Sequence, residues 1–302
     1  MTTRSSVSGG PLDSRADSLE ALIISAPELS PLPRMLRRAI HSAKDDHWRR
    51  GVAEATMSAR ADGVPLLHGT TLTADGAEVR SLLAELATEV GADVAGRLIA
   101  ALQHGRMEAI EIIQAAIRYD EERLDQWTLE AEIDTGILGV VAQMTALPLL
   151  LACGQRFDSQ VTTMAWSKGY CPVCGGWPTL AEMRGLERQQ WLRCGRCASS
   201  WEHGLGACVF CGEDDHEQLG YLAPERERES RRAVTCESCH GYLKTFATLA
   251  ALSAADIVAR DLSSVELDVA ALDEGYQRPS EAGYRPNVRL EPTRRRWRGW
   301  RS

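Results

Sequence analysis

The sequence predicts a mixed, mainly α-helical protein with an N-terminal helical domain, a tandem of rubredoxin-like or zinc-ribbon metal modules, and C-terminal helices. Two observations support this prediction. Apolar residues recur at helical spacing through the first half of the chain. Eight of the nine cysteines then fall, as four CxxC pairs, in a loop-like segment that is rich in glycine and tryptophan. A chain of 302 residues can form one large domain or two modest ones around a hydrophobic core.

The composition is that of a soluble globular protein, with 44% apolar and 25% charged residues. A net charge of -8 argues against a chain that coats nucleic acid or an anionic membrane along its whole length. The longest apolar run, 136–153, is interrupted by Gln143, Thr145 and Pro148, which indicates a buried helix rather than a membrane span. Residues 1–10 contain no apolar core of a secretory signal, so we expect a cytoplasmic location, where thiols bind metals more often than they form disulfides.

The helical part is expected to begin after a disordered N-terminus, residues 1–14, and to extend over residues 15–165. Asp75 and Glu78 form a capping box, and the apolar residues after it follow a helical period up to Gly91. The other expected helices cover the ranges 33–60, 94–105, 108–123 and 136–151, the last of which should lie at the centre of a bundle.

The remaining chain divides into three predicted parts. Residues 166–241 form the tandem CxxC region, residues 242–276 form C-terminal helices, and residues 277–302 form a basic tail. From Arg285 to Ser302 the tail contains seven arginines and one glutamate.

The candidate metal ligands are the eight cysteines of the CxxC pairs. Two such pairs can place four thiolates around one ion, at about 2.3 Å for zinc. Nineteen residues separate the first pair from the second and twenty-four separate the third from the fourth, which suits two sequential modules. The ten residues between Cys197 and Cys208 leave open a single site made by the two middle pairs. The ligands are Cys171, Cys174, Cys194, Cys197, Cys208, Cys211, Cys236 and Cys239.

Glycine after the second cysteine of a pair permits the left-handed backbone that such a turn takes. Gly175 and Gly212 occupy this position in the first and third pairs, whereas Ala198 and His240 occupy it in the others, which makes those two turns less ideal. Zinc and iron both accept four thiolates, so the spacing predicts two metal ions without deciding between them. The lone Cys153 is interpreted as a small buried apolar residue, and His203, His216 and His240 as solvated side chains.

Catalytic and cofactor-binding residues are not predicted. The sequence has no diagnostic pair of acid–base carboxylates, nucleophile elbow, P-loop or GxGxxG motif, which favours a binding protein over an enzyme.

The cysteine region resembles the FdhE family of formate dehydrogenase accessory proteins. The similarity rests on C-P-V-C-G-G-W-P, W-L-R-C-G-R-C-A-S-S-W, C-V-F-C-G, C-E-S-C-H-G-Y-L-K and, downstream, R-D-L-S-S-V-E-L-D. It spans roughly 30–288 and is most specific over 166–275. The sequence departs from the family in lacking an arginine before the third pair, in having Arg260 where an acidic residue is expected, and in its longer Arg/Trp tail.

The resemblance implies an assembly factor that binds the catalytic subunit of a molybdenum- or tungsten-dependent formate dehydrogenase and does not itself oxidise formate. Two alternatives remain: a nucleic-acid-binding zinc ribbon, suggested by the tail with Trp297 and Trp300, and a rubredoxin-type electron carrier. Trp177, Trp191 and Trp201 either face the client or fill a small strand layer. No membrane partner is expected, and the sequence leaves homodimerisation open.

Overall fold

The computed structural model describes residues 19–20, 23–24, 31–53 and 61–293 of the chain. The disordered N-terminus predicted for residues 1–14 and the Arg/Trp end of the predicted tail, residues 294–302, lie outside the described residues. The residue limits proposed for separate domains stay a prediction. Buried side chains from the helices and from the first cysteine module belong to one continuous apolar cluster.

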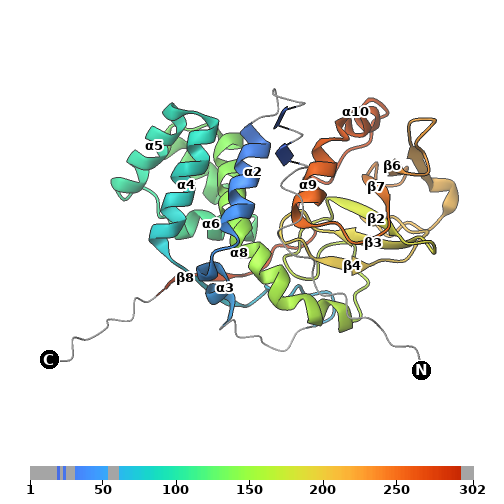
Figure 1. Cartoon of the computed structure of the whole chain (residues 1–302), viewed down its shortest axis with the longest axis horizontal. Helices are drawn as coiled ribbons and strands as arrows, with labels where there is room; N and C mark the ends of the chain where they lie inside the picture. The colour runs from blue at the N-terminus through green and yellow to red at the C-terminus, as the bar shows by residue number, and fades with distance from the viewer. Residues whose placement is uncertain (1–18, 21–22, 25–30, 54–60, 294–302) are drawn as a thin grey trace.

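Helices make up one side of the molecule, and a sheet covered by two further helices makes up the other (Figure 1). The capping box is confirmed in part, because the Asp75 carboxylate accepts a hydrogen bond from the Ala77 N–H at the start of α4. The helices of the first side are α2 (Pro31–Ser42), α3 (Asp46–Ala53), α4 (Gly76–Val90), α5 (Ala92–Gln103), α6 (Ala109–Arg118), α7 (Glu121–Ala131) and α8 (Thr135–Thr163).

Helix α8 is the central helix of the protein, as the apolar run predicts. It packs against α2, α3, α4, α6 and α7. It is long and apolar enough to cross a membrane, but 67% of its most apolar window is buried inside the protein, as expected of a core helix. It continues to Thr163, well past the predicted end at residue 151.

Two of the predicted helices are each interrupted. The range 33–60 contains α2 and α3 with a turn between them, and residues 54–60 lie outside the described part. The range 108–123 contains the end of α6 at Arg118 and the start of α7 at Glu121. Tyr119 separates these helices with a left-handed backbone, φ 56°. Because this break is made by tyrosine rather than glycine, the sequence did not indicate it.

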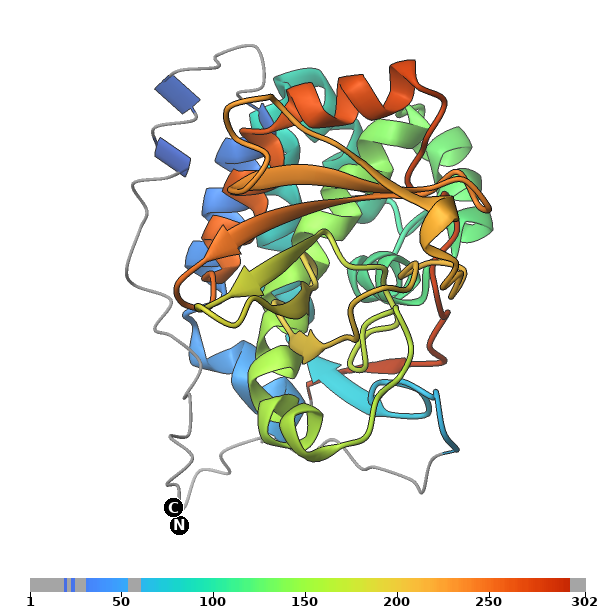
Figure 2. The same cartoon turned by 90° about the vertical axis from the view of Figure 1, so that its right-hand side faces the viewer.

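A six-stranded sheet in the order β4-β3-β2-β7-β6-β5 carries the cysteine region (Figure 2). It consists of two antiparallel three-stranded units that are joined by the parallel pairing of β2 with β7. The strands are β2 (Leu180–Arg184), β3 (Gln189–Arg193), β4 (Ser200–Glu202), β5 (Leu219–Leu222), β6 (Arg231–Cys236) and β7 (Tyr242–Thr248).

The predicted start of the C-terminal helices at residue 242 is wrong. Residues 242–248 form β7, and helices begin only at α9 (Ala254–Leu262) and α10 (Val265–Asp273). The strand is central in the sheet, and its Lys244 is fully buried between the carboxylates of Asp261 and Asp268. A lysine in a buried strand conceals the strand pattern, because sequence reasoning assigns charged residues to solvent-exposed faces.

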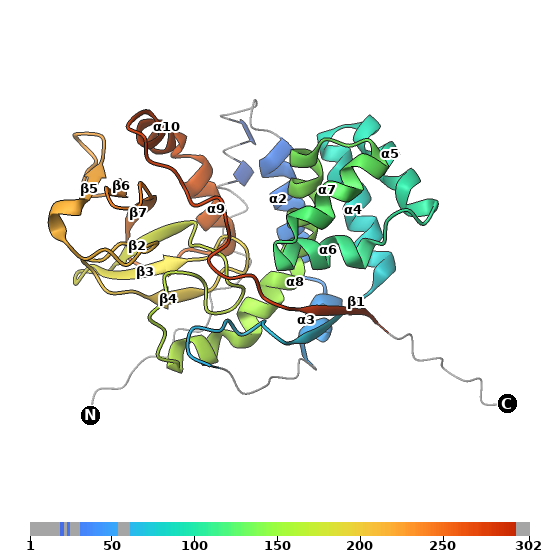
Figure 3. The same ribbon diagram turned by 180° about the vertical axis from the view of Figure 1, so that it is seen from behind.

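Part of the predicted tail is also structured. β8 (Arg289–Pro292) pairs in parallel with β1 (Thr71–Ala74), beneath the helices in Figure 3. Val288 and Leu290 are 1% and 6% exposed. This strand depends on a partner more than two hundred residues away in sequence, so the local composition did not predict it.

Candidate metal centres

The structure brings the eight cysteines together in the sequential pairing. The first centre contains the first two CxxC pairs, and the second centre contains the third and fourth, with all four sulfurs of each centre within 4.8 Å of one another. Sulfur–sulfur distances are 3.5 Å for Cys171–Cys197 and Cys174–Cys194. They are 3.7 Å for Cys208–Cys239 and for Cys211–Cys236.

These distances fit metal coordination. Thiolates at the corners of a tetrahedron, each about 2.3 Å from a zinc ion, are roughly 3.8 Å apart. A disulfide requires about 2.05 Å, and all nine cysteines are free. Four thiolates in this arrangement suit zinc or iron, and the donor set does not discriminate between the two metals.

All four CxxC turns have the same backbone frame. In every turn the first cysteine's N–H donates to the carbonyl two residues after the second cysteine, and in the first three turns the first cysteine's carbonyl accepts from the N–H of the residue directly after the second cysteine. That residue has a left-handed backbone in every turn, including the two that lack glycine. The φ angles are 77° at Gly175, 57° at Ala198, 80° at Gly212 and 53° at His240.

The first centre lies where the helices meet the sheet. Its four cysteines are 0–1% exposed. The Leu66 N–H donates to Pro172 O at 2.7 Å and Leu67 N–H donates to Val173 O at 3.0 Å, which ties the first turn to the loop before β1. On α8, a side chain at Gly154 would clash with the Cys197 carbonyl, so the glycine allows the central helix to contact the second turn directly.

Protonation in the first centre is unequal. Burial raises the pKa values of the Cys171 and Cys197 thiols well above their usual range. Hydrogen bonds from the other three cysteines, Cys171 first, hold the pKa of Cys174 well below that range. A metal that binds all four sulfurs as thiolates must displace their protons.

The second centre lies at the solvent edge of the sheet. Cys211 is exposed and Cys239 is half-buried, while Cys208 and Cys236 are buried. Burial raises the pKa of Cys208 to about 11. Burial also opposes ionisation of Cys236, but N–H groups of the fourth turn, at Cys239 and Ser238, bring its pKa below the usual value.

An aromatic contact joins the two centres. Phe210, inside the third CxxC turn, meets the Trp177 ring edge to face, with centroids 5.3 Å apart. Trp177 follows the first turn by three residues, and its indole N–H donates to Glu281 O at 2.9 Å. The two modules therefore contact each other through the sheet and through these rings.

The histidines interpreted as solvated differ in position, because His203 is half-buried and His240 is exposed but directly follows Cys239 in the fourth CxxC turn. Among the described residues, neither cysteine cluster includes a histidine. His216 has a side chain that is 94% exposed. Cys153 is fully buried in α8, where burial raises the pKa of its thiol.

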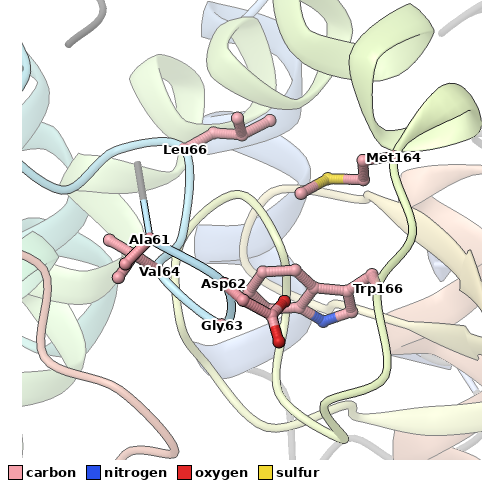
Figure 4. A pocket seen from close by; sticks show the side chains of 7 residues that line it. All are labelled: Ala61, Asp62, Gly63, Val64, Leu66, Met164 and Trp166. Atoms are coloured by element: carbon pink, nitrogen blue, oxygen red, sulfur yellow. The ribbon is translucent and has the colours of Figure 1, made fainter. Parts of the chain in front are cut away.

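A pocket of about 290 Å³ lies beside the first centre, between the loop 61–66 and the end of α8 (Figure 4). The side chains of Met164 and Trp166 face Asp62 across it. Asp62 is the sole titratable residue of the described lining, so the pocket provides no nucleophile and base together.

Sequence reasoning missed residues that support the first centre. Arg196 occupies the second middle position of the second CxxC turn, where the other turns have Val173, Phe210 and Ser238. Its guanidinium is stacked on Tyr119, at 4.0 Å from the ring centroid. The sequence did contain one indication of this role, because Arg196 occupies a position that is apolar in two of the other turns.

Together these features define the class of the protein: a helical and β protein with two four-cysteine metal-binding sites on one sheet. Residues 207–283 match the sequence model of the family described as FdhE, C-terminal domain, and this range contains all four cysteines of the second centre. The cysteine-rich part of the chain is therefore homologous to FdhE family proteins.

Individual relatives agree with this assignment. An FdhE homologue of Pseudomonas aeruginosa is 38% identical over 138 residues, which is 42% of this chain and 41% of the relative. One from Aquifex aeolicus is 31% identical over 115 residues, 37% of this chain and 40% of the relative. FdhE of Escherichia coli is 31% identical over 113 residues, 37% of this chain and 36% of the relative. The aligned segments thus span about two fifths of these relatives.

The fold is shared over a longer range. The crystal structure of the FdhE protein from Pseudomonas aeruginosa superposes with a TM-score of 0.50 at 22% identity, covering 91% of this chain and 96% of that chain. This similarity extends the common fold beyond the cysteine modules to the helices.

Proposed function

We propose that the chain binds two metal ions, one on each group of four cysteine thiolates, and that these ions are zinc or iron. The sulfur–sulfur distances of 3.5 and 3.7 Å support this proposal. The ions would stabilise the two CxxC modules, because metal binding to such sites is coupled to folding.

We further propose that the chain is a cytoplasmic accessory protein for a molybdenum- or tungsten-dependent formate dehydrogenase. In this role it would bind the catalytic subunit during maturation and would not oxidise formate itself. The observation that carries the proposal is the match of residues 207–283 to the FdhE C-terminal domain, which includes a complete four-cysteine centre.

The two CxxC modules provide a rigid surface, which suits a protein that recognises a folded client. Trp177 and Trp191 are half-buried and can contribute part of their rings to a contact. Trp201 is 2% exposed and fills the core, so it is not a candidate for that surface. We place the client contact on the side of the second centre, where Cys211 and Leu205 are exposed.

The test combines metal analysis with client capture. The full chain is purified without oxygen, its zinc and iron are counted, and it is used to capture the catalytic subunit of the host's formate dehydrogenase. We expect two metals per chain and a retained subunit, with both reduced by Cys211→Ser. Cys153→Ala is the matched control, because it removes a cysteine outside the two centres and should leave both results unchanged.

The alternatives predict other outcomes of the same preparation. Two metals without capture, together with bound nucleic acid that is lost on truncation after Pro292, would favour a nucleic-acid-binding protein. Visible absorption from ferric iron on four thiolates would support the capacity for electron transfer. Fewer than one metal per chain would contradict the metal proposal.

A further inference from the structure

Arg196 is a half-buried residue whose guanidinium has no carboxylate partner among the described residues. Its Nη2 donates to the Ala116 carbonyl at 2.6 Å, and its Nε and Nη1 are buried with no hydrogen-bond partner among the described residues. No ion pair joins it to an acidic side chain within the described ranges 31–53 and 61–293. Isolated burial of a guanidinium is costly, so a negative charge is required nearby.

Carboxylates perform this role elsewhere in the protein. Lys244 is fully buried, and its Nζ lies 2.8 Å from Asp261 Oδ1 and 2.7 Å from Asp268 Oδ2. Arg193 is buried against the carboxylate of Glu182. Arg196 differs from both because the anionic groups beside it are sulfurs.

The sulfurs of the first centre supply that charge. Arg196 lies inside the second CxxC turn, between Cys194 and Cys197, and its Cδ lies 3.6 Å from the place where a side chain at Gly176, two residues after Cys174, would begin. A divalent ion on four thiolates leaves the site with a net double negative charge, in a region where the ligands are 0–1% exposed. The positive guanidinium of Arg196 and the negatively charged metal-loaded site therefore neutralise each other in part.

Helix α6 holds the guanidinium in place. Ala116 lies in its last turn, where its carbonyl accepts the Tyr119 N–H at 3.4 Å as well as the guanidinium, and the helix dipole attracts a cation. Tyr119 ends this helix, and its ring stacks on the guanidinium at 4.0 Å. The Tyr119 hydroxyl is itself buried without a hydrogen-bond partner among the described residues.

We propose that Arg196 is the counter-cation of the first metal centre, positioned by Tyr119 and the Ala116 carbonyl, so that metal retention depends on the end of α6. The proposal rests on metal binding by the first centre. It makes Arg196 a positioning residue that couples the helices to the metal, and it gives the second centre no equivalent, since Phe210 and Ser238 occupy the matching positions there.

The experiment measures zinc affinity of the first centre alone. Cys211→Ser and Cys239→Ser are introduced together in the full chain to disable the second centre, and zinc is titrated against a competing chelator. Arg196→Met, which removes the charge and keeps the length, should lower the affinity at least about tenfold. Arg196→Lys should restore most of it. Arg188→Met is the control, because it removes an exposed arginine paired with Glu229.

Thermal unfolding separates charge compensation from helix capping. Arg196→Met should destabilise the zinc-loaded protein more than the zinc-free protein, because the loaded site carries the larger negative charge. Equal losses in the two forms, or unchanged zinc affinity, would overturn the proposal in favour of a cap on α6. If Arg196→Met does not fold, Arg196→Lys provides the test. A tenfold loss of zinc affinity in Arg196→Lys would show that the shape of the guanidinium is required and that its charge alone is not sufficient.

The result also distinguishes this inference from the metal proposal. Zinc bound to the unsubstituted chain with no effect of Arg196→Met contradicts the role of Arg196 alone. An unsubstituted chain that takes up no zinc contradicts both.

Discussion

The two four-cysteine centres share a backbone frame and differ in what surrounds them. In the first, all four cysteines are at most 1% exposed, and their turns contact α8 and the loop before β1. In the second, Cys211 is exposed and Cys239 is half-buried. The same set of four cysteines therefore connects the helices to the sheet in the first centre and faces solvent in the second.

The largest expected difference is in stability. Cys174→Ser should lower the free energy of unfolding by more than about 4 kcal/mol, because it removes a ligand from a site at the centre of the core. Cys211→Ser should cost roughly 1–2 kcal/mol, because its site is at the edge. Denaturant unfolding followed by far-UV circular dichroism measures both. Equal losses would remove the proposed distinction between the centres.

The second half of the sheet is stabilised by the buried Lys244 and its carboxylate partners, and this contribution should not depend on metal. Asp268→Asn should destabilise the protein by about 3 kcal/mol at neutral pH, because it weakens the pairing of a buried lysine. Although burial opposes ionisation, hydrogen bonds from Lys244 and Tyr242 hold the pKa of Asp268 below its usual value.

The stabilisation from Asp268 therefore has a defined pH dependence. A carboxyl whose pKa is lowered by folding contributes fully above its unfolded pKa and loses that contribution as pH falls through the folded value. The difference between the wild type and Asp268→Asn should hold from pH 7 to about 4 and shrink below it. A difference that disappears already near pH 6 would contradict the assignment.

Metal exchange should distinguish the centres by rate. A chelator should remove the metal of the second centre at least about tenfold faster than that of the first, since solvent reaches Cys211 and not the first four sulfurs. Release is followed with a coloured chelator, and Cys211→Ser identifies the fast phase by its loss. A single phase that accounts for both metals would show that exposure does not control exchange.

The smallest expected effect concerns the shared turn frame. His240→Gly should stabilise the protein by up to about 1 kcal/mol, because glycine adopts the left-handed backbone at this exposed position without a steric cost. Ala198→Gly should gain less, since the Ala198 methyl group packs against two apolar clusters. Thermal unfolding of the two variants provides the comparison, and destabilisation by His240→Gly would contradict it.

The sequence predicted the cysteine clusters well because a CxxC turn is local. Two cysteines at this spacing need only a few residues to orient their sulfurs, and the gaps of nineteen and twenty-four residues left room for a pair of strands. The central helix was also predicted, because an apolar run of this length is stable only where it is buried in the core.

The missed features depend on distant or unusual partners. Strand β8 forms only against β1, and β7 contains Lys244, whose neutralising carboxylates lie on α9 and α10. The break between α6 and α7 is made by Tyr119 in a left-handed conformation that no glycine marks. Arg196 became a candidate only when the structure placed its guanidinium over the Tyr119 ring.

X-ray absorption at the metal edge, combined with the metal count of the anaerobically purified full chain, tests the central claim most directly. The account predicts two metals per chain, each with four sulfur neighbours at about 2.3 Å if the metal is zinc. Cys211→Ser should leave the first metal with that sulfur shell intact. Nitrogen or oxygen neighbours in place of sulfur, or fewer than one metal per chain, would contradict the two-centre account.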